Sequence, residues 1–232
     1  QFSINTSVVP IVWENTKLNI LDTPGYFDFV GEVESAVSAA DAAVIVVSGK
    51  SGVEVGTIKA WEMCEKYNIP RMIFVTDMDL DNASFRQAVE DLKEQFGKRI
   101  APFHQPIREN EKFVGFVNIV KMAGRRFTSL TEYEDFDIPD YSKENLATYR
   151  DNIMEAVAET SEEYMERYFN GEEFTLEEIL GALKENVKTS GMVPVAINDK
   201  VFFNKYSSGS PKGSQSMRFS SLSGYVGLNP SL

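Results

Sequence analysis

The chain has 232 residues, 43% of them hydrophobic, and a formal net charge of −12 at pH 7. This length can bury a sizeable core in one large domain or two modest ones. The acidic balance argues against unspecific, charge-driven binding to nucleic acid. The single cysteine, Cys64, excludes an internal disulfide framework and fits a reducing cytoplasm. No apolar run approaches the roughly twenty residues that cross a bilayer, so no membrane association is expected.

The first third of the chain predicts alternating strands and helices. Two apolar segments flank Glu14–Thr16 and predict a hairpin, with Pro10 placing the first of them at a sheet edge. Continuous apolar runs at 42–48 and 71–75 predict strands covered by helices on both faces. Helical patterns lie at 27–40 and 53–67. The pattern is typical of a doubly wound α/β core with one antiparallel edge.

The character of the sequence changes after Asp79. A helical pattern is followed by two short apolar segments, and Thr160 with Glu163 and Thr175 with Glu178 predict two helix starts with capping boxes. The segment Val193–Ile197 is a candidate return strand to the first sheet. We therefore divide the chain into a truncated core at 1–80, an inserted α+β subdomain at 81–190, a return segment at 191–206 and a serine-rich, mobile tail at 207–232.

One motif at a strand end could carry chemistry. Asp22 ends an apolar segment and is followed by Thr23, Pro24 and Gly25. In a GTPase, such an aspartate holds magnesium through water and the glycine amide meets the γ-phosphate. The same residues also suit a tight strand-to-helix turn that binds nothing. A phosphate loop of the pattern G-x-x-x-x-G-K-[ST] should precede the motif, but no glycine does, so we expect the chain to begin after that loop.

A second strand end carries a possible base-reading motif. The stretch RMIFVTDMD ends at Asp79, where a GTPase has Asn-Lys-x-Asp and its final carboxylate accepts two hydrogen bonds from guanine. With this match, the chain resembles the GTPase domain of elongation factor G and its relatives, the tetracycline-resistance ribosomal protection proteins and release factor three. The residues that carry the resemblance are SINTSVVPIVWENTKLNILDTPG, VVSGKSGVEVGTIKAWEMCEKYNIPRMIFV, FVGFVNIVKM and SEEYMERYFNGEEFTLEEILGAL. They cover most of the chain from Gln1 to about Val195.

The resemblance implies a P-loop GTPase-like doubly wound sheet, here lacking the phosphate loop, with an inserted α+β subdomain. It also implies GTP and magnesium as cofactors of the intact protein, the ribosome as partner, and contact between the acidic helices and the large-subunit stalk protein. The simpler interpretation of this acidic run, around Glu163 to Glu178, is a solvated helical face. The matching positions are Ser3 for a magnesium-binding hydroxyl, Asp22, Thr23, Pro24 and Gly25 for switch two, and Thr76, Asp77, Met78 and Asp79 for the guanine motif.

Three departures from the family pattern weaken the expectation of activity. Tyr26 stands where the family has a catalytic histidine, and Thr76 and Asp77 replace asparagine and lysine. A phenol keeps its proton at neutral pH, so it could orient water but is a poor general base. The first hypothesis is a fragment of a cytoplasmic translation factor with ribosome-dependent GTP hydrolysis, inactive as this chain. The alternative is a degenerate, non-hydrolysing relative that binds the ribosome or another protein without nucleotide.

The other residues of reactive types are expected to have structural or surface roles. The only histidine, His104, has no recognisable carboxylate partner and is expected to be structural, and Cys64 is expected in the core. An acidic segment lacks the glycine and glutamate of a calcium loop, and a small basic cluster is read as a surface strand end rather than an RNA contact. These two groups are Asp135, Asp137 and Asp140, and Lys121, Arg125 and Arg126.

Overall fold

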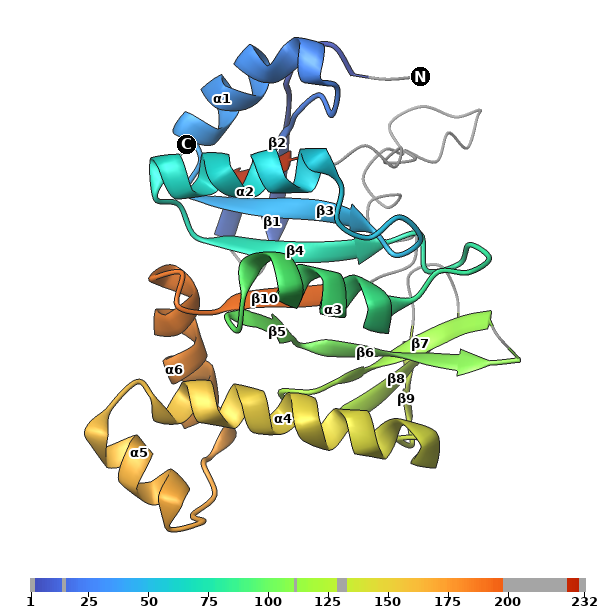
Figure 1. Ribbon diagram of the computed structural model, residues 1–232, viewed down its shortest axis with the longest axis vertical. Helices are drawn as coiled ribbons and strands as arrows, with labels where there is room; N and C mark the ends of the chain where they lie inside the picture. The colour runs from blue at the N-terminus through green and yellow to red at the C-terminus, as the bar shows by residue number, and fades with distance from the viewer. Residues whose placement is uncertain (1–2, 14–15, 111, 129–132, 198–224, 230–232) are drawn as a thin grey trace.

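The computed structural model describes residues 3–13, 16–110, 112–128, 133–197 and 225–229 (Figure 1). These residues form a seven-stranded sheet and a four-stranded sheet. In the described ranges, no helix combines the length and the apolar character needed to cross a membrane.

The larger sheet has the strand order β1-β2-β11-β3-β4-β10-β5. Strands β3, β4, β10 and β5 are parallel, β1 and β2 form an antiparallel hairpin at the edge, and β11 is antiparallel to both of its neighbours. Their bounds are β1 Ser7–Trp13, β2 Thr16–Asp22, β3 Ala42–Ser48, β4 Arg71–Thr76, β5 Ile100–Pro102, β10 Val193–Ile197 and β11 Tyr225–Asn229. Pro10 lies in the edge strand β1, where its missing N–H costs no ladder hydrogen bond.

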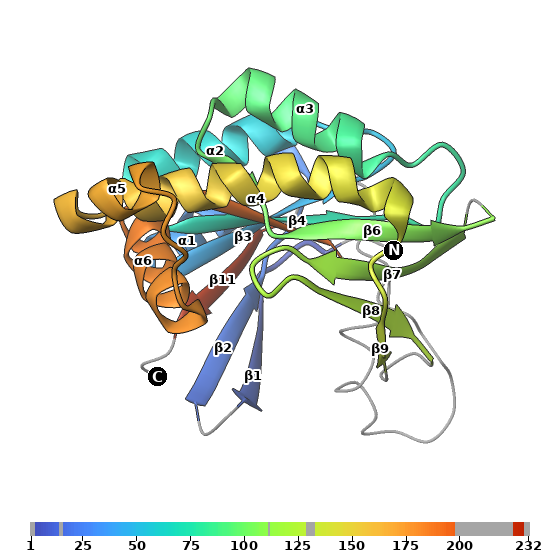
Figure 2. The same ribbon diagram turned by 90° about the horizontal axis from the view of Figure 1, so that it is seen from below.

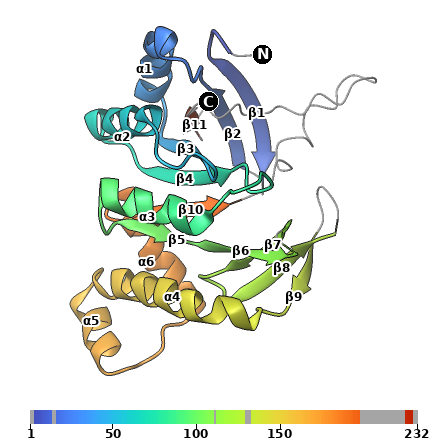
Figure 3. The same cartoon turned by 45° about the vertical axis from the view of Figure 1, so that its right-hand side comes forward.

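Three helices pack on this sheet, one above another along one side of it (Figure 3). They are α1 Val30–Ser38, which follows the 3-10 turn Phe27–Phe29, α2 Val55–Tyr67 and α3 Phe85–Phe96. Their apolar residues share one core with Ile45, Val47, Ile73 and Val75 from β3 and β4. The alternate residues of these two strands are only half-buried. Within the described part of the chain, one face of β3 and β4 is therefore covered more completely than the other, whereas the sequence predicted helices on both faces.

The smaller sheet is antiparallel, in the order β6-β7-β8-β9. Its strands are β6 His104–Glu109, β7 Lys112–Asn118, β8 Ala123–Phe127 and β9 Tyr133–Phe136. The sequence did not predict β9, and it indicated β8 only as a surface strand end at Arg125 and Arg126, because neither segment contains a run of apolar residues. The helices α4 Lys143–Ala158, α5 Glu162–Phe169 and α6 Leu176–Lys188 follow, and residues of α4 and α6 share a second core with this sheet. Helices α5 and α6 lie at one end of α4 (Figure 2).

The two predicted capping boxes have different outcomes. The box of α6 is confirmed, because the Thr175 hydroxyl accepts from the Glu178 N–H and the Glu178 carboxylate accepts from the Thr175 N–H. The other box is wrong by one residue, since Ser161 caps α5 by accepting from the Tyr164 N–H at 3.1 Å. The Thr160 hydroxyl instead donates to the Val157 carbonyl at the end of α4, 2.6 Å away.

The end of the chain differs from its prediction as a mobile tail. Tyr225–Asn229 forms β11, and Val226 is paired with Asp22 of β2 and with Val44 of β3. Five residues are too few to show a periodicity, and their pairing depends on strands about two hundred residues away. The remaining parts of the predicted tail, 207–224 and 230–232, lie outside the described residues.

Candidate functional site

The larger sheet changes its direction of growth between β2 and β3. The chain places β1 beside β2 on one side and β4 beside β3 on the other, while β11 lies between β2 and β3. Because β11 is antiparallel to both, β2 and β3 run in the same direction and their carboxyl ends share one edge. Ligands of open α/β sheets bind outside the carboxyl ends of the strands at such a switch point. The fold therefore directs attention to the loops after β2, β3 and β4.

Asp22 lies at the carboxyl end of β2. Its backbone pairs with Ser7 on β1 and with Val226 on β11, and burial raises the pKa of its carboxyl group. Thr23 and Pro24 are buried behind it, whereas Gly25 is half-buried. The ionised carboxylate is thus held where water solvates it incompletely, and a cation bound there would stabilise the charged form.

Tyr26 follows this turn and is 41% exposed. Its carbonyl accepts from the Phe29 N–H at 3.1 Å, which begins the 3-10 turn that leads into α1. The turn therefore presents the phenol side chain at the surface of the same edge as Asp22.

Ser3 reaches this edge as well. Strand β1 starts at Ser7, opposite Asp22, so the exposed Ser3 precedes the strand at the end where β2 finishes. Thr6 fastens this segment to α1, because its N–H donates to the Glu32 carboxylate at 3.0 Å. Among the residues that the structure describes, no three metal-binding side chains cluster. One carboxylate and one hydroxyl fit Mg²⁺, which commonly completes its shell with water and substrate phosphate oxygens.

The loop after β4 turns one side chain inward and the next outward. Asp77 has a left-handed backbone with φ of 58°, a conformation that aspartate tolerates better than most residues. Met78 is fully buried and Asp79 is exposed. The Leu80 N–H donates to the Asp77 carbonyl at 3.1 Å and closes the turn. Asp79 is consequently exposed at the edge of the sheet where the carboxyl ends of β2, β3 and β4 lie, which we call the ligand edge.

Gly49, directly after β3, braces this loop. Its N–H donates to the Thr76 carbonyl at 2.8 Å, and its carbonyl accepts from the Ser84 N–H at 2.8 Å. A Cβ at this position would lie 2.6 Å from the Met78 sulfur and 3.1 Å from the Thr76 carbonyl oxygen. Sequence reasoning missed Gly49, and its only signal was a glycine immediately after an apolar strand.

The predicted site residues share an edge but do not form one compact cluster. Three strand spacings, about 14 Å, separate β2 from β4 because β11 and β3 lie between them. Val226 pairs with both Asp22 and Val44, so Asp22 lies at the same height in the sheet as Val44. Val44 comes four residues before Ser48, which pairs with Thr76 at the end of β4. Asp22 and Asp79 thus suit the two ends of an extended ligand rather than a single small one.

The remaining candidates have structural surroundings. His104 Nδ1 accepts from the Ile197 N–H at 3.4 Å, its ring lies 4.4 Å from that of Phe116, and burial lowers its pKa to about 4. Cys64 is fully buried in the first core, and burial raises the pKa of its thiol to about 11. Neither residue belongs to the ligand edge.

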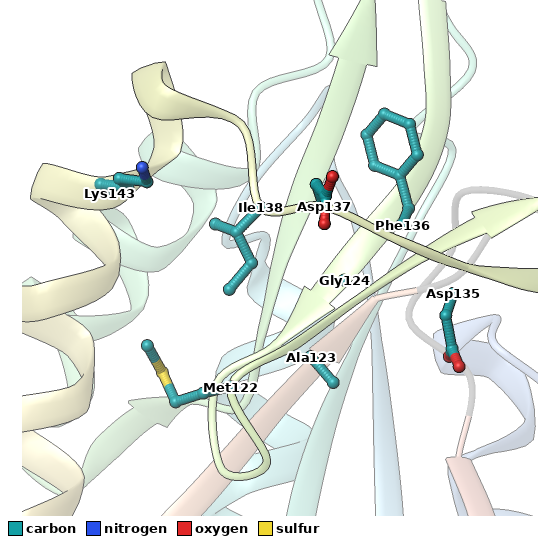
Figure 4. A pocket seen from close by; sticks show the side chains of 8 residues that line it. All are labelled: Met122, Ala123, Gly124, Asp135, Phe136, Asp137, Ile138 and Lys143. Atoms are coloured by element: carbon teal, nitrogen blue, oxygen red, sulfur yellow. The ribbon is translucent and has the colours of Figure 1, made fainter.

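Several acidic and basic groups of the smaller sheet have partners within it or at the start of α4. Asp140 pairs with Lys143 at 2.5 Å. Arg125 lies over the Tyr133 ring at 4.1 Å, and Arg126 pairs with Glu109 at 2.6 Å. Asp135 and Asp137 border an open hollow between β8, β9 and the start of α4 (Figure 4), which is also lined by Met122, Ala123, Gly124, Phe136, Ile138 and Lys143.

Comparison with known proteins identifies the family. The family model described as the elongation factor Tu GTP binding domain matches residues 1–195. A crystal structure of a protein from Thermus thermophilus is similar, with a TM-score of 0.79 and 35% sequence identity over 85% of this chain. The match covers 30% of that protein, so the chain spans less than a third of its length. Because the family match covers well over half of the chain, the chain belongs to the translational GTPases, and its residues 1–195 match their GTP-binding domain.

Proposed function

We propose that this chain contributes the magnesium-binding and guanine-reading groups of an elongation factor G-like protein, whose longer form hydrolyses GTP on the ribosome in the cytoplasm. The observation that carries the proposal is the placement of Asp22 and Asp79 after two strands at one ligand edge. Such an arrangement suits a nucleotide that lies across the switch point, with its phosphates near Asp22 and its base near Asp79.

The residues present fit defined roles. Asp22 and Ser3 would hold Mg²⁺, which neutralises phosphate charge when bound. Asp79 would accept hydrogen bonds from guanine, and the backbone of Gly25 would meet the terminal phosphate. Tyr26 would orient the attacking water rather than take its proton, because a phenol stays protonated at neutral pH.

Nucleotide binding is the first test. Fluorescent GTP and GDP should be titrated with Mg²⁺ into this chain and into a longer form that extends upstream of Gln1. We expect the longer form to bind and this chain to bind weakly or not at all. In the longer form, Asp79→Asn should weaken GDP binding roughly a hundredfold, because two hydrogen bonds to a charged group are lost. Asp81→Asn, at an exposed position of the same loop, is the matched control and should bind normally.

Three departures from the family pattern support a second candidate function, a non-hydrolysing relative that binds a partner without nucleotide. Tyr26, Thr76 and Asp77 each differ from the residue that the family uses with nucleotide. If the longer form is folded and binds neither GTP nor GDP, our proposal changes from the GTPase to the degenerate, non-hydrolysing relative that binds a partner without nucleotide.

The helices α5 and α6 supply a further part of the proposal, contact with the large-subunit stalk protein. Phe169, Leu176 and Leu180 are 77%, 44% and 46% exposed, and they lie among many glutamates. Exposed apolar side chains bordered by charge are typical of a protein-binding patch. Leu180→Ser should weaken binding of purified stalk protein at least tenfold, whereas Val12→Ser, on the distant strand β1, should not. Equal affinities of wild type and Leu180→Ser would exclude this contact.

A further inference from the structure

The smaller sheet reaches across to the loop that presents Asp79. Arg108, on β6, donates from Nη2 to the Met78 carbonyl at 3.0 Å and to the Ala83 carbonyl at 2.9 Å. Both carbonyls belong to the segment between β4 and α3. A planar guanidinium with donors in a fixed geometry is suited to hold two backbone acceptors at once. We call the smaller sheet with α4, α5 and α6 the inserted unit, and one of its side chains therefore contacts this loop near both of its ends.

Arg108 is itself held in position. The register of β6 and β7 shifts between Ile107 and Arg108, and such an irregularity redirects the side chain that follows it. The Tyr141 hydroxyl accepts from the Arg108 N–H at 3.0 Å and donates to the Arg108 carbonyl at 3.0 Å. Tyr141 belongs to the 3-10 turn Asp140–Ser142 that leads into α4. The backbone of Arg108 is thus clamped by the segment that connects the smaller sheet to its helices.

Both the side chain and the backbone carbonyl of Met78 are held in place. Its side chain is fully buried beside Gly49, while its carbonyl accepts from Arg108 on the inserted unit. Asp79 is the next residue along the chain, so its backbone starts from a fixed point. Without Arg108, both the Met78 and Ala83 carbonyls would lose a charged donor, and the turn between them would open more readily.

We infer that Arg108 is a positioning residue, which holds Asp79 for guanine and couples the inserted subdomain to base recognition. The role of Asp79 in this inference rests on the proposed function. The tether itself does not, because it is a property of the folded chain. Movement of the inserted unit, for example on partner binding, would pull on the base-reading loop through the Arg108 side chain.

The tether is tested on this chain by hydrogen exchange. We expect Arg108→Met to raise the exchange of amides in 77–84 roughly ten- to a hundredfold, because two half-buried, charge-assisted hydrogen bonds are removed. Arg150→Met is the matched control, since Arg150 also donates to two carbonyls of the inserted unit, those of Ile119 at 3.0 Å and Val120 at 2.6 Å. If amide exchange in 77–84 is unchanged in Arg108→Met, or if it rises equally in Arg108→Met and Arg150→Met, the tether is overturned.

The consequence for base reading is tested with GDP and inosine 5′-diphosphate, which lacks the exocyclic amino group of guanine. In the longer form, wild type should prefer GDP about tenfold or more. Arg108→Met should reduce that preference, and Arg108→Lys, which keeps the charge on a shorter side chain without the planar guanidinium, should restore part of it. If Arg108→Met lowers the affinity for both nucleotides by the same factor, the role of Arg108 is merely structural and the positioning claim is overturned.

The two arms separate failure of this inference from failure of the proposed function. If the wild-type longer form binds no guanine nucleotide, the proposed function fails, and the positioning of a base-reading residue fails with it. A selective rise in exchange of 77–84 in Arg108→Met would still establish the tether between the inserted unit and this loop.

Discussion

The single histidine makes the pH dependence of stability a direct test of the packing between the two sheets. His104 begins β6, and its Nδ1 accepts a hydrogen bond from the Ile197 N–H of β10. Burial is the main reason that its pKa falls to about 4 from an ordinary 6.5, and the positive charge of Arg125 acts in the same direction. The folded protein therefore holds the imidazole neutral, with Nδ1 unprotonated.

The sign and size of the effect follow from proton linkage. As the pH falls, the unfolded chain takes up the proton near 6.5, while the folded chain resists until about 4. Stability from this group is therefore complete above about pH 7.5 and is lost as the pH falls toward 4. The loss is about 2 kcal/mol by pH 5 and about 3 kcal/mol by pH 4, at 1.36 kcal/mol for each pH unit between the two pKa values.

The assay is urea unfolding of wild type and of His104→Asn between pH 7.5 and 5. The asparagine oxygen can still accept from the Ile197 N–H, but it does not titrate, so the variant should lose about 2 kcal/mol less over this range. Carboxyl groups contribute equally to both proteins and cancel in the comparison. Parallel pH profiles for the two proteins would refute the claim that the folded protein keeps the His104 imidazole neutral down to pH 5.

Three further perturbations probe the core and the sheet by denaturant or thermal unfolding. Gly49→Ala should cost about 1–3 kcal/mol, because its Cβ would lie 3.1 Å from the Thr76 carbonyl oxygen; unchanged stability would mean that this loop yields easily. Glu65→Ala should cost about 2 kcal/mol, since Arg71 stays buried without its 2.8 Å carboxylate partner. Adding Arg71→Leu should recover part of this loss, and a purely additive double variant would contradict the explanation. Deleting 225–232 should lower the melting temperature more than removing the last three residues alone, and equal effects would argue against β11.

Much of the larger sheet could be predicted because its signal is local. The apolar run at 42–48 gives β3 with the predicted bounds, and the run that starts at Arg71 gives β4, one residue longer than predicted. The first predicted helix is shorter than expected, since its first three residues form a 3-10 turn and α1 begins only at Val30. Helix ends depend on backbone geometry that periodicity does not report.

The candidate site could be predicted only where a motif marks it. Asp22 and Asp79 were found because each follows an apolar strand at a recognisable spacing. Arg108 gave no such signal, because its importance comes from two carbonyls that lie 25 and 30 residues away in sequence. Its direction also depends on a register shift that appears only when β6 pairs with β7. Contacts of this kind arise from tertiary structure and have no counterpart in residue type.

The orientation of β11 connects the fold to the expectation of weak nucleotide binding by this chain. A strand parallel to β2 and β3 at the switch point would send its following loop to the ligand edge, beside the loops after β2, β3 and β4. β11 is antiparallel, so it brings its amino end to that edge, and Val226 pairs with Asp22 there. The position between β2 and β3 is thus filled by a strand that runs in the wrong direction to lead into a phosphate-binding loop at that edge. A longer form that places a parallel strand between β2 and β3 would have to displace β11, and its nucleotide affinity should rise when 225–232 is deleted.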